Sequence, residues 1–197
     1  MPAMPTAPDY AELRRHVRGT QHARSFPLLV IGGLLVNYAV TSFQSTPVAW
    51  RFGAPLAFVL IWALGKLNEQ AYGVGAPRGD YLVAAGAVFI ATNFLILITR
   101  FAAGANFHEL IGAWVIIVGL ALAVLSRASR DVVLLAAGLL IIAAGLVIAA
   151  VGTADFGTGF QSWTVFARSW SILLVAVVGV LLGLTGLLLY RSERAQQ

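Results

Sequence analysis

The sequence predicts an all-α integral membrane protein with six transmembrane helices, and three observations support this fold class. Hydrophobic residues make up 59% of the 197 residues and charged residues only 11%, whereas a soluble domain carries about 25% charged residues. Six long uncharged runs are each close to the roughly 20 apolar residues that cross a bilayer. Most Lys and Arg residues lie at the ends of these runs or in the segments between them, as is typical of membrane spans.

A basic N-terminal segment, residues 1–25, precedes the spans. Asp9 and Glu12 resemble a capping box and predict a short cytoplasmic amphipathic helix, whose arginines contact anionic headgroups. The first apolar run is too long, and lacks a convincing cleavage site, for a removed signal peptide. The spans of the transmembrane domain (26–190) are predicted at 26–44, 49–67, 81–99, 110–126, 132–151 and 170–190, followed by a cytoplasmic tail at 191–197.

The second span contains a proline near its beginning. A helix from Pro55 to Leu67 would have 13 residues, too short to cross a hydrocarbon core of ~30 Å. We therefore predict that the helix begins at Pro47, with Thr46 as N-cap, and that it bends at Pro55.

The connection before the third span reads GVGAPRGD, residues 73–80. Its glycines follow the spacing GxGxxxG with no preceding strand, so a turn between two helices is favoured over a phosphate-binding loop. Asp80 then caps the third span, and Asp131 opens the fifth. This polar connection is also a predicted docking site for a cytoplasmic partner, through Glu69 and Arg78.

An outer interfacial segment is predicted before the sixth span. Its large apolar residues recur at steps of four and three, which places them on one helix face. Such a face fits a segment that lies on the membrane, and it fits equally a cap over a pocket. The residues are Phe156, Phe160, Trp163, Ala167 and Trp170.

The distribution of positive charge predicts the orientation. One side carries ten of the 13 Lys and Arg residues, and the other carries Arg51, Arg100 and Arg168. By the positive-inside rule the first side is cytoplasmic, so the spans form three in–out–in hairpins with both termini inside. The predicted location is the cytoplasmic membrane of a bacterium.

Small residues are predicted to pack the helices together. Gly179 and Gly183 form a GxxxG pattern on the sixth span, and Ala176 extends that face. Packing within the chain is favoured, while a homo-oligomer or a membrane protein partner remains open. Weaker pairs are Gly145 with Ala149 and Ala87 with Ala91. The hairpins show no convincing internal repeat.

No ionisable residue lies in the centre of any predicted span, which argues against a proton-coupled pump. Polar and aromatic residues gather instead toward the outer side, where they fit a pocket for a ligand. They also fit hydrogen bonds between helices together with Arg side chains that reach the headgroups, and this account is favoured. The residues are Asn37, Trp50, Arg51, Asn93, Arg100, His108, Glu109, Asp155 and Arg168.

Nothing in the sequence predicts an enzyme. There is no nucleophile motif, phosphate-binding lysine or HExxH pattern, and His108 with Glu109 lacks a second histidine on the same face. We therefore expect no catalytic residues, no metal and no cofactor. The net charge of +5 follows membrane topology, so we expect the lipid bilayer as a partner and no nucleic acid.

Two functions fit these features. The first is an accessory or regulatory subunit that works through membrane partners. The second is the substrate-capturing component of a transporter for a small neutral or weakly charged solute, entered from outside. In span number and length the chain resembles the substrate-capturing subunits of energy-coupling-factor vitamin transporters. That resemblance implies docking through a small-residue motif on the first span, where this chain has Gly32 and Gly33 but no AxxxA. Its composition also resembles membrane proteins of high-GC bacteria.

Overall fold

The chain is all-helical in the residues that its computed structural model describes, which are 25–41, 47–72, 80–102, 111–129, 131–153 and 161–195. Six helices occupy these ranges, and each coincides with most of one predicted span. The first is named by its residues, Ser25–Thr41. The others are α2 (Pro47–Tyr72), α3 (Asp80–Ala102), α4 (Ile111–Ser129), α5 (Val132–Thr153) and α6 (Gln161–Ala195). The amphipathic helix predicted within residues 1–25 lies almost entirely outside the described residues.

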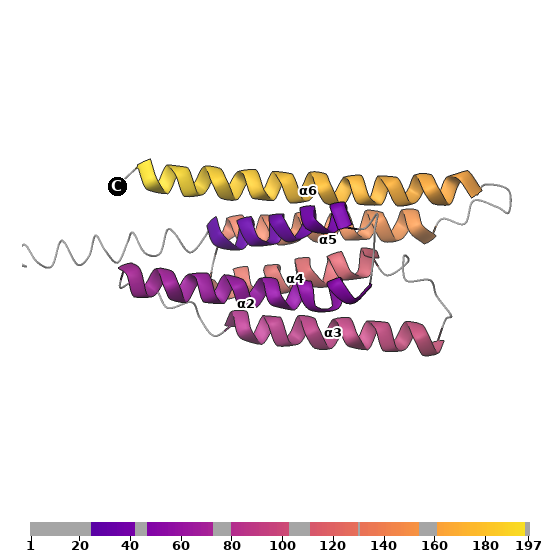
Figure 1. Ribbon diagram of the computed structural model, residues 1–197, viewed down its shortest axis with the longest axis horizontal. Helices are drawn as coiled ribbons and strands as arrows, with labels where there is room; N and C mark the ends of the chain where they lie inside the picture. Colours follow the sequence, from indigo (N-terminus) through magenta and orange to yellow (C-terminus); the bar gives the residue numbers. More distant parts are fainter. Residues whose placement is uncertain are drawn as a thin grey trace, which may run out of the picture.

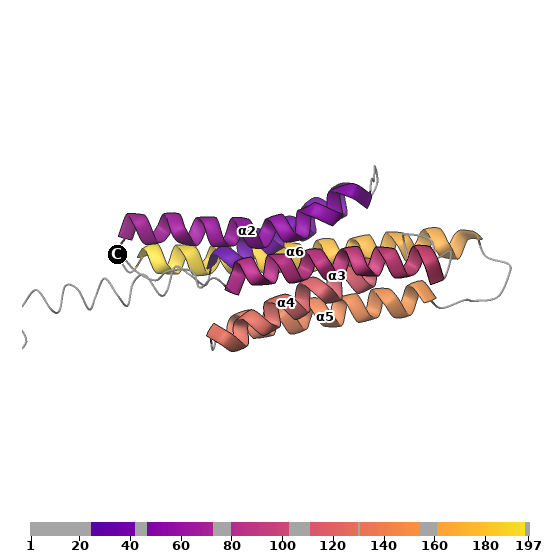
Figure 2. The same ribbon diagram turned by 90° about the horizontal axis from the view of Figure 1, so that it is seen from below.

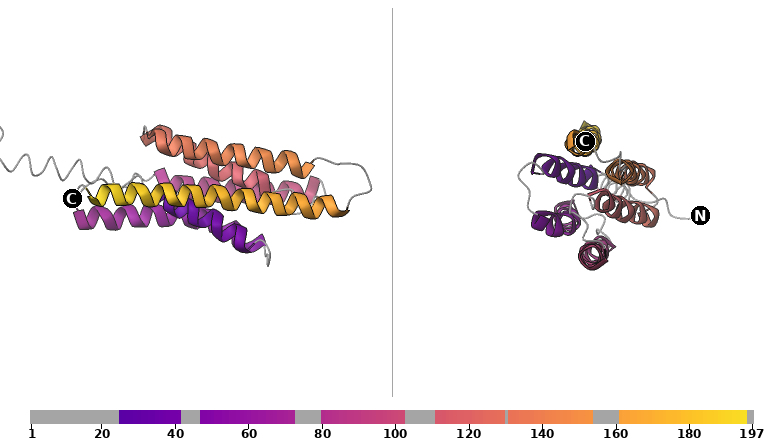
Figure 3. Two further views of the ribbon diagram at one scale, coloured as in Figure 1. Left: turned by 90° about the horizontal axis from the view of Figure 1, so that it is seen from above. Right: turned by 90° about the vertical axis from the view of Figure 1, so that its right-hand side faces the viewer.

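Consecutive helices run in opposite directions along one bundle (Figure 1). Each helix from α2 to α6 contacts the next one in the sequence, and the Ser25–Thr41 helix contacts both α2 and α6. The contacts therefore close the six helices into a ring. In the end view of Figure 3, α6 and α3 lie at opposite ends of the cross-section, with the four other helices between them.

One hydrophobic cluster fills the interior, with members from all six helices. Its most central side chains are Phe58, Ile31, Leu122 and Ile141, each with essentially no exposed surface. Phe58 is the largest of the fully buried side chains. The ring is thus flattened around a packed core.

Large apolar side chains also cover much of the outside, such as Val83, Leu139 and Leu188. Soluble monomers rarely expose so many large apolar side chains, because continuous apolar surface promotes association. Three helices of the described chain are long and apolar enough to cross a membrane: Asp80–Ile98, Val132–Ala150 and Trp170–Ser192. These properties indicate a membrane protein.

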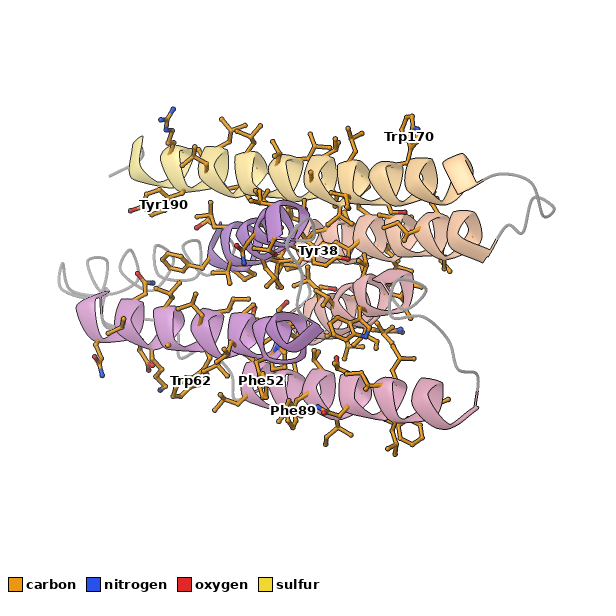
Figure 4. All side chains as sticks on the ribbon, turned by 45° about the vertical axis from the view of Figure 1, so that its right-hand side comes forward. Tyr38, Phe52, Trp62, Phe89, Trp170 and Tyr190 are labelled. Carbon is orange, nitrogen blue, oxygen red and sulfur yellow. The ribbon has the colours of Figure 1, made fainter. Side chains whose placement is uncertain are left out.

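Aromatic residues mark both ends of the candidate span in α6. Figure 4 shows Trp170 and Tyr190 near opposite ends of this helix. At 1.5 Å per residue they are about 30 Å apart along the axis, which matches the thickness of the hydrocarbon core. Trp and Tyr favour the membrane–water interface, so the pair fits a span that runs between these two residues.

α2 begins at Pro47 and contains Pro55, which confirms the predicted early start. In Figure 2 the N-terminal half of α2, which contains Pro55, bends away from the axis of the rest. α6 differs from the prediction, because Gln161–Ala195 is one continuous helix of 35 residues. The segment that precedes the sixth span therefore continues along the axis of that span, and no break is present that would let it turn onto the membrane surface.

A tight turn joins α4 to α5. The Asp131 carboxylate accepts hydrogen bonds from the backbone N–H groups of Val133 (3.0 Å) and Leu134 (3.4 Å). These are N–H groups that the first turn of a helix leaves without a partner. The prediction that Asp131 opens the fifth span is confirmed.

Candidate functional site

α4 and α5 approach each other closely along their length, and glycines from both helices face each other in this contact. A Cβ atom built on Gly112 would lie 2.7 Å from Gly145 O and 2.7 Å from Ala149 N. A Cβ on Gly138 would lie 2.9 Å from Gly119 O and 2.8 Å from Ala123 N. Real Cβ atoms essentially never come so close to backbone atoms, so only glycine fits at these two positions. The two contacts are equivalent, with the roles of α4 and α5 exchanged.

This symmetry follows from an internal repeat that the sequence analysis missed. Residues 112–123 and 138–149 share the pattern G-x3-I-x2-G-L-x2-A. Because the helices are antiparallel, the two copies of this pattern face each other across a local two-fold axis. Ile116 then lies over Gly145, and Ile142 over Gly119. The repeat can be recognised in the sequence from the same spacing of small residues in two neighbouring segments. A search for identical tripeptides does not detect it, because variable residues separate the shared ones.

A second glycine contact joins the first and last described helices. A Cβ on Gly32 would lie 2.6 Å from Gly183 N and 2.8 Å from Gly179 O. A Cβ on Gly179 would lie 2.9 Å from both Gly32 O and Val36 N. The GxxxG pattern predicted on this part of the chain is therefore placed in α6, against the Ser25–Thr41 helix. Ala176, on the same helix, is half-buried.

The two glycines of this GxxxG are not equivalent. A Cβ on Gly183 would meet nothing within 4 Å. Gly183 is close to Gly32 through its backbone, not through the position that a side chain would take. Of Gly32, Gly179 and Gly183, the first two therefore need to be glycine for the helices to approach, and Gly183 does not.

The weaker small-residue pairs have different surroundings. Gly145 and Ala149 lie in the α4–α5 contact. Ala87 of α3 is exposed, and Ala91 is half-buried. The alanine pair on α3 is therefore not buried in a tight helix contact within the described residues.

The two asparagines of the predicted outer layer lie on helices that α2 separates (Figure 3). Asn37, on the Ser25–Thr41 helix, is exposed. Asn93, on α3, is half-buried, and its side-chain nitrogen donates to the carbonyl oxygen of Phe89 at 2.7 Å. Asn93 thus uses a carbonyl of its own helix.

The remaining residues of the outer layer are placed only in part. Trp50 and Arg51 belong to the first turns of α2, Arg100 to the last turn of α3, and Arg168 to α6. These parts of the three helices lie toward the same end of the bundle (Figure 1), but their side chains are not among those described. His108, Glu109 and Asp155 lie outside the described residues.

At the opposite end, Glu69 of the predicted docking site forms an ion pair with Lys66 at 3.0 Å. Both side chains are partly exposed, at 31% and 43%, so water screens the pair and it stabilises the fold only slightly. Arg78 lies outside the described residues.

An aromatic contact between Phe52 and Phe89, with ring centroids 6.1 Å apart, joins α2 to α3 (Figure 4).

Hydroxyl groups in the described helices mostly hydrogen-bond to their own helix. The acceptor is a carbonyl oxygen three or four residues earlier, the usual arrangement for Ser and Thr within helices. The pairs are Thr41 to Asn37, Ser126 to Ala123, Ser129 to Ser126, Thr185 to Leu181 and Ser192 to Leu189. Within the described residues, no group of three acidic or histidine side chains is placed to hold a metal ion.

The chain has no significant match among protein-family models, curated proteins or solved structures. What can be assigned to it therefore depends on its own helices and contacts. The best-defined feature of the described chain is its two glycine contacts between helices, and none of its described polar groups gathers into a reactive cluster.

Proposed function

We propose that this chain is an accessory or regulatory subunit of the cytoplasmic membrane of a bacterium, and that it acts by binding another membrane protein. The observation that carries the proposal is the packed apolar core of the described helices. Side chains such as Phe58 and Ile141 fill the core, and glycine contacts bring two pairs of helices to within backbone contact. A carrier that holds a solute within the bundle needs polar groups that face one another, whereas most hydroxyls of the described helices donate to their own backbones.

The topology of the proposal has three in–out–in hairpins and cytoplasmic termini. In this orientation the end of the bundle that carries the ion pair of Lys66 with Glu69 faces the cytoplasm. The connection that follows α2 is the longest polar connection on that side. Together with the basic N-terminal segment it offers a surface for the partner.

Capture of the partner from native membranes tests this proposal. A tagged chain is purified in mild detergent, and the proteins that remain bound are quantified by mass spectrometry against an untagged control. We expect a membrane protein to be enriched in constant ratio to the chain. A double variant, Glu69→Gln with Arg78→Gln, should reduce the capture several-fold.

Arg127→Gln is the matched control. Arg127 is exposed in the last turn of α4, on the same predicted side as Glu69 but in another connection. Equal capture by the control, the double variant and the unaltered chain would exclude docking at the connection after α2. If no protein is enriched, and a small solute instead raises the unfolding temperature of the purified chain, the accessory function is wrong and the carrier function is favoured.

A further inference from the structure

The Ser25–Thr41 helix has one face that no other described helix covers. Its buried side chains, Leu28, Ile31 and Leu35, are no more than 1% exposed and enter the core. Gly33 and Asn37, one turn apart, are both exposed, as are Val40 and Thr41 one turn further on. These four residues form the outward face of this helix.

The contact with α6 gives the depth of this face. Gly32 lies opposite Gly183, and Val36 lies opposite Gly179. In an antiparallel pair with this register, Asn37 is level with Val178. Val178 lies well inside the candidate span Trp170–Ser192. Asn37 is therefore at a depth where the chain is surrounded by hydrocarbon.

The side chain of Asn37 has no hydrogen bond to the described part of the chain, although its backbone oxygen accepts one from Thr41 at 2.8 Å. A carboxamide without a partner in an apolar medium costs several kcal/mol. Asn93 differs, because its side chain donates to Phe89 O. The exposed carboxamide of Asn37 therefore calls for an external partner that can both donate and accept hydrogen bonds.

The backbone next to Asn37 is open to such a partner. A Cβ built on Gly33 would meet nothing within 4 Å, so another helix can come close at this turn. Interfaces between helices in membranes combine small residues with hydrogen-bonding side chains of this kind. Gly33 and Asn37 provide both on one face.

We propose that a second copy of this chain docks on the outward face of the Ser25–Thr41 helix, with the two Asn37 carboxamides hydrogen-bonded to each other. A carboxamide has both donors and an acceptor, so two identical ones satisfy each other. Two copies inserted in the same orientation place Asn37 at the same depth. A two-fold axis along the membrane normal then brings each residue of this face opposite its own copy. This dimer goes beyond the proposed function, because it requires no other protein.

Cysteine cross-linking tests the dimer, since the chain has no cysteine of its own. Val40→Cys places a thiol on the outward face, where Val40 is 66% exposed. Val83→Cys on α3 is the control, because Val83 is 72% exposed on another helix. Each variant is purified and reconstituted in vesicles of phosphatidylcholine and phosphatidylglycerol, then oxidised. We expect a disulfide-linked dimer from Val40→Cys at a yield several-fold above that from Val83→Cys.

A second measurement isolates the carboxamide. Energy transfer between labelled copies, followed as the vesicles are diluted with lipid, gives the dissociation constant of the dimer. Asn37→Leu should raise this constant roughly 3- to 20-fold, as expected for loss of an interhelical hydrogen bond, while Asn37→Gln should keep it within about threefold. Thermal unfolding of each variant checks that the fold is retained.

Equal cross-linking of Val40→Cys and Val83→Cys would overturn the proposal. So would a folded Asn37→Leu variant with an unchanged dissociation constant. If the purified chain is monomeric in vesicles but Val40→Cys cross-links to a different protein in native membranes, the second copy is also the wrong occupant of this face.

Discussion

Gly119 and Gly138 face each other so closely that a Cβ on either would lie 2.9 Å from the carbonyl oxygen of the other. The pair lies within the local two-fold symmetry of α4 and α5. Lipid is as apolar as the side chains, so the approach of two helices in a membrane depends on close packing rather than on exclusion of water. Glycine at both positions therefore determines how close these helices come.

Substitution of Gly138 by alanine should destabilise the chain. The new Cβ would meet backbone atoms of Ala123 and Gly119, which can move only if the helices separate. We expect a loss of about 1–3 kcal/mol in the free energy of unfolding, typical of an overpacked site, measured by SDS titration in mixed micelles. Gly86→Ala is the control, because a Cβ there meets nothing within 4 Å. Similar loss in both variants would mean that the tight contact is not the cause.

The contact between the first and last described helices makes an asymmetric prediction. Gly32→Ala and Gly179→Ala should each destabilise the chain by about 1–3 kcal/mol, since their Cβ atoms would lie under 3 Å from backbone atoms. Gly183→Ala should leave stability nearly unchanged, although it disrupts the GxxxG pattern. The three variants are compared by the same SDS titration. A large loss for Gly183→Ala would show that the helices are packed differently.

Asp131 should stabilise the start of α5. Asp131→Ala removes the acceptor for the N–H groups of Val133 and Leu134, and loss of such a cap costs about 0.5–2 kcal/mol. Hydrogen exchange at those two amides should become faster than in the unaltered chain. Asp131→Asn keeps a side-chain oxygen that can cap, so its exchange should change less. Exchange that is unaffected in the alanine variant would contradict this role.

The predicted topology can be read from single cysteines in the cysteine-free chain. A membrane-impermeant maleimide applied to intact cells should label Asn106→Cys in the predicted outer connection. Ala76→Cys, in the predicted inner connection, should be labelled only after the membrane is opened. Labelling of both in intact cells, or of Ala76→Cys alone, would exclude the orientation derived from the positive charges.

The sequence predicts the positions of the helices well, because an uncharged run must form its hydrogen bonds internally in a membrane. It predicts which face is buried much less well. On α5, Ile141 is fully buried while Leu139 is 55% exposed, and nothing in their chemistry separates them. Lipid and core accept the same side chains, so the hydrophobic pattern carries little information on direction.

Glycine carries more of that information. The GxxxG pattern of Gly179 and Gly183 is visible in the sequence, but its contact with Gly32 depends on the register of two helices almost 150 residues apart. The repeat in α4 and α5 was missed because its shared residues are separated by variable ones. The outer polar layer is less predictable. The sequence gives the approximate depth of Asn37 along its helix, but it does not show whether this side chain points to the core or outward.

The ring of contacts also has a consequence for biosynthesis. α4 and α5 are adjacent in the chain and can pair as soon as both have left the ribosome. The contact of Gly32 with Gly179 can form only after α6 has been synthesised, long after the Ser25–Thr41 helix. At 5–20 residues per second, this delay is on the order of ten seconds. During translation the first described helix therefore lacks its last neighbour for that interval, and the face that Gly32 presents to α6 stays uncovered.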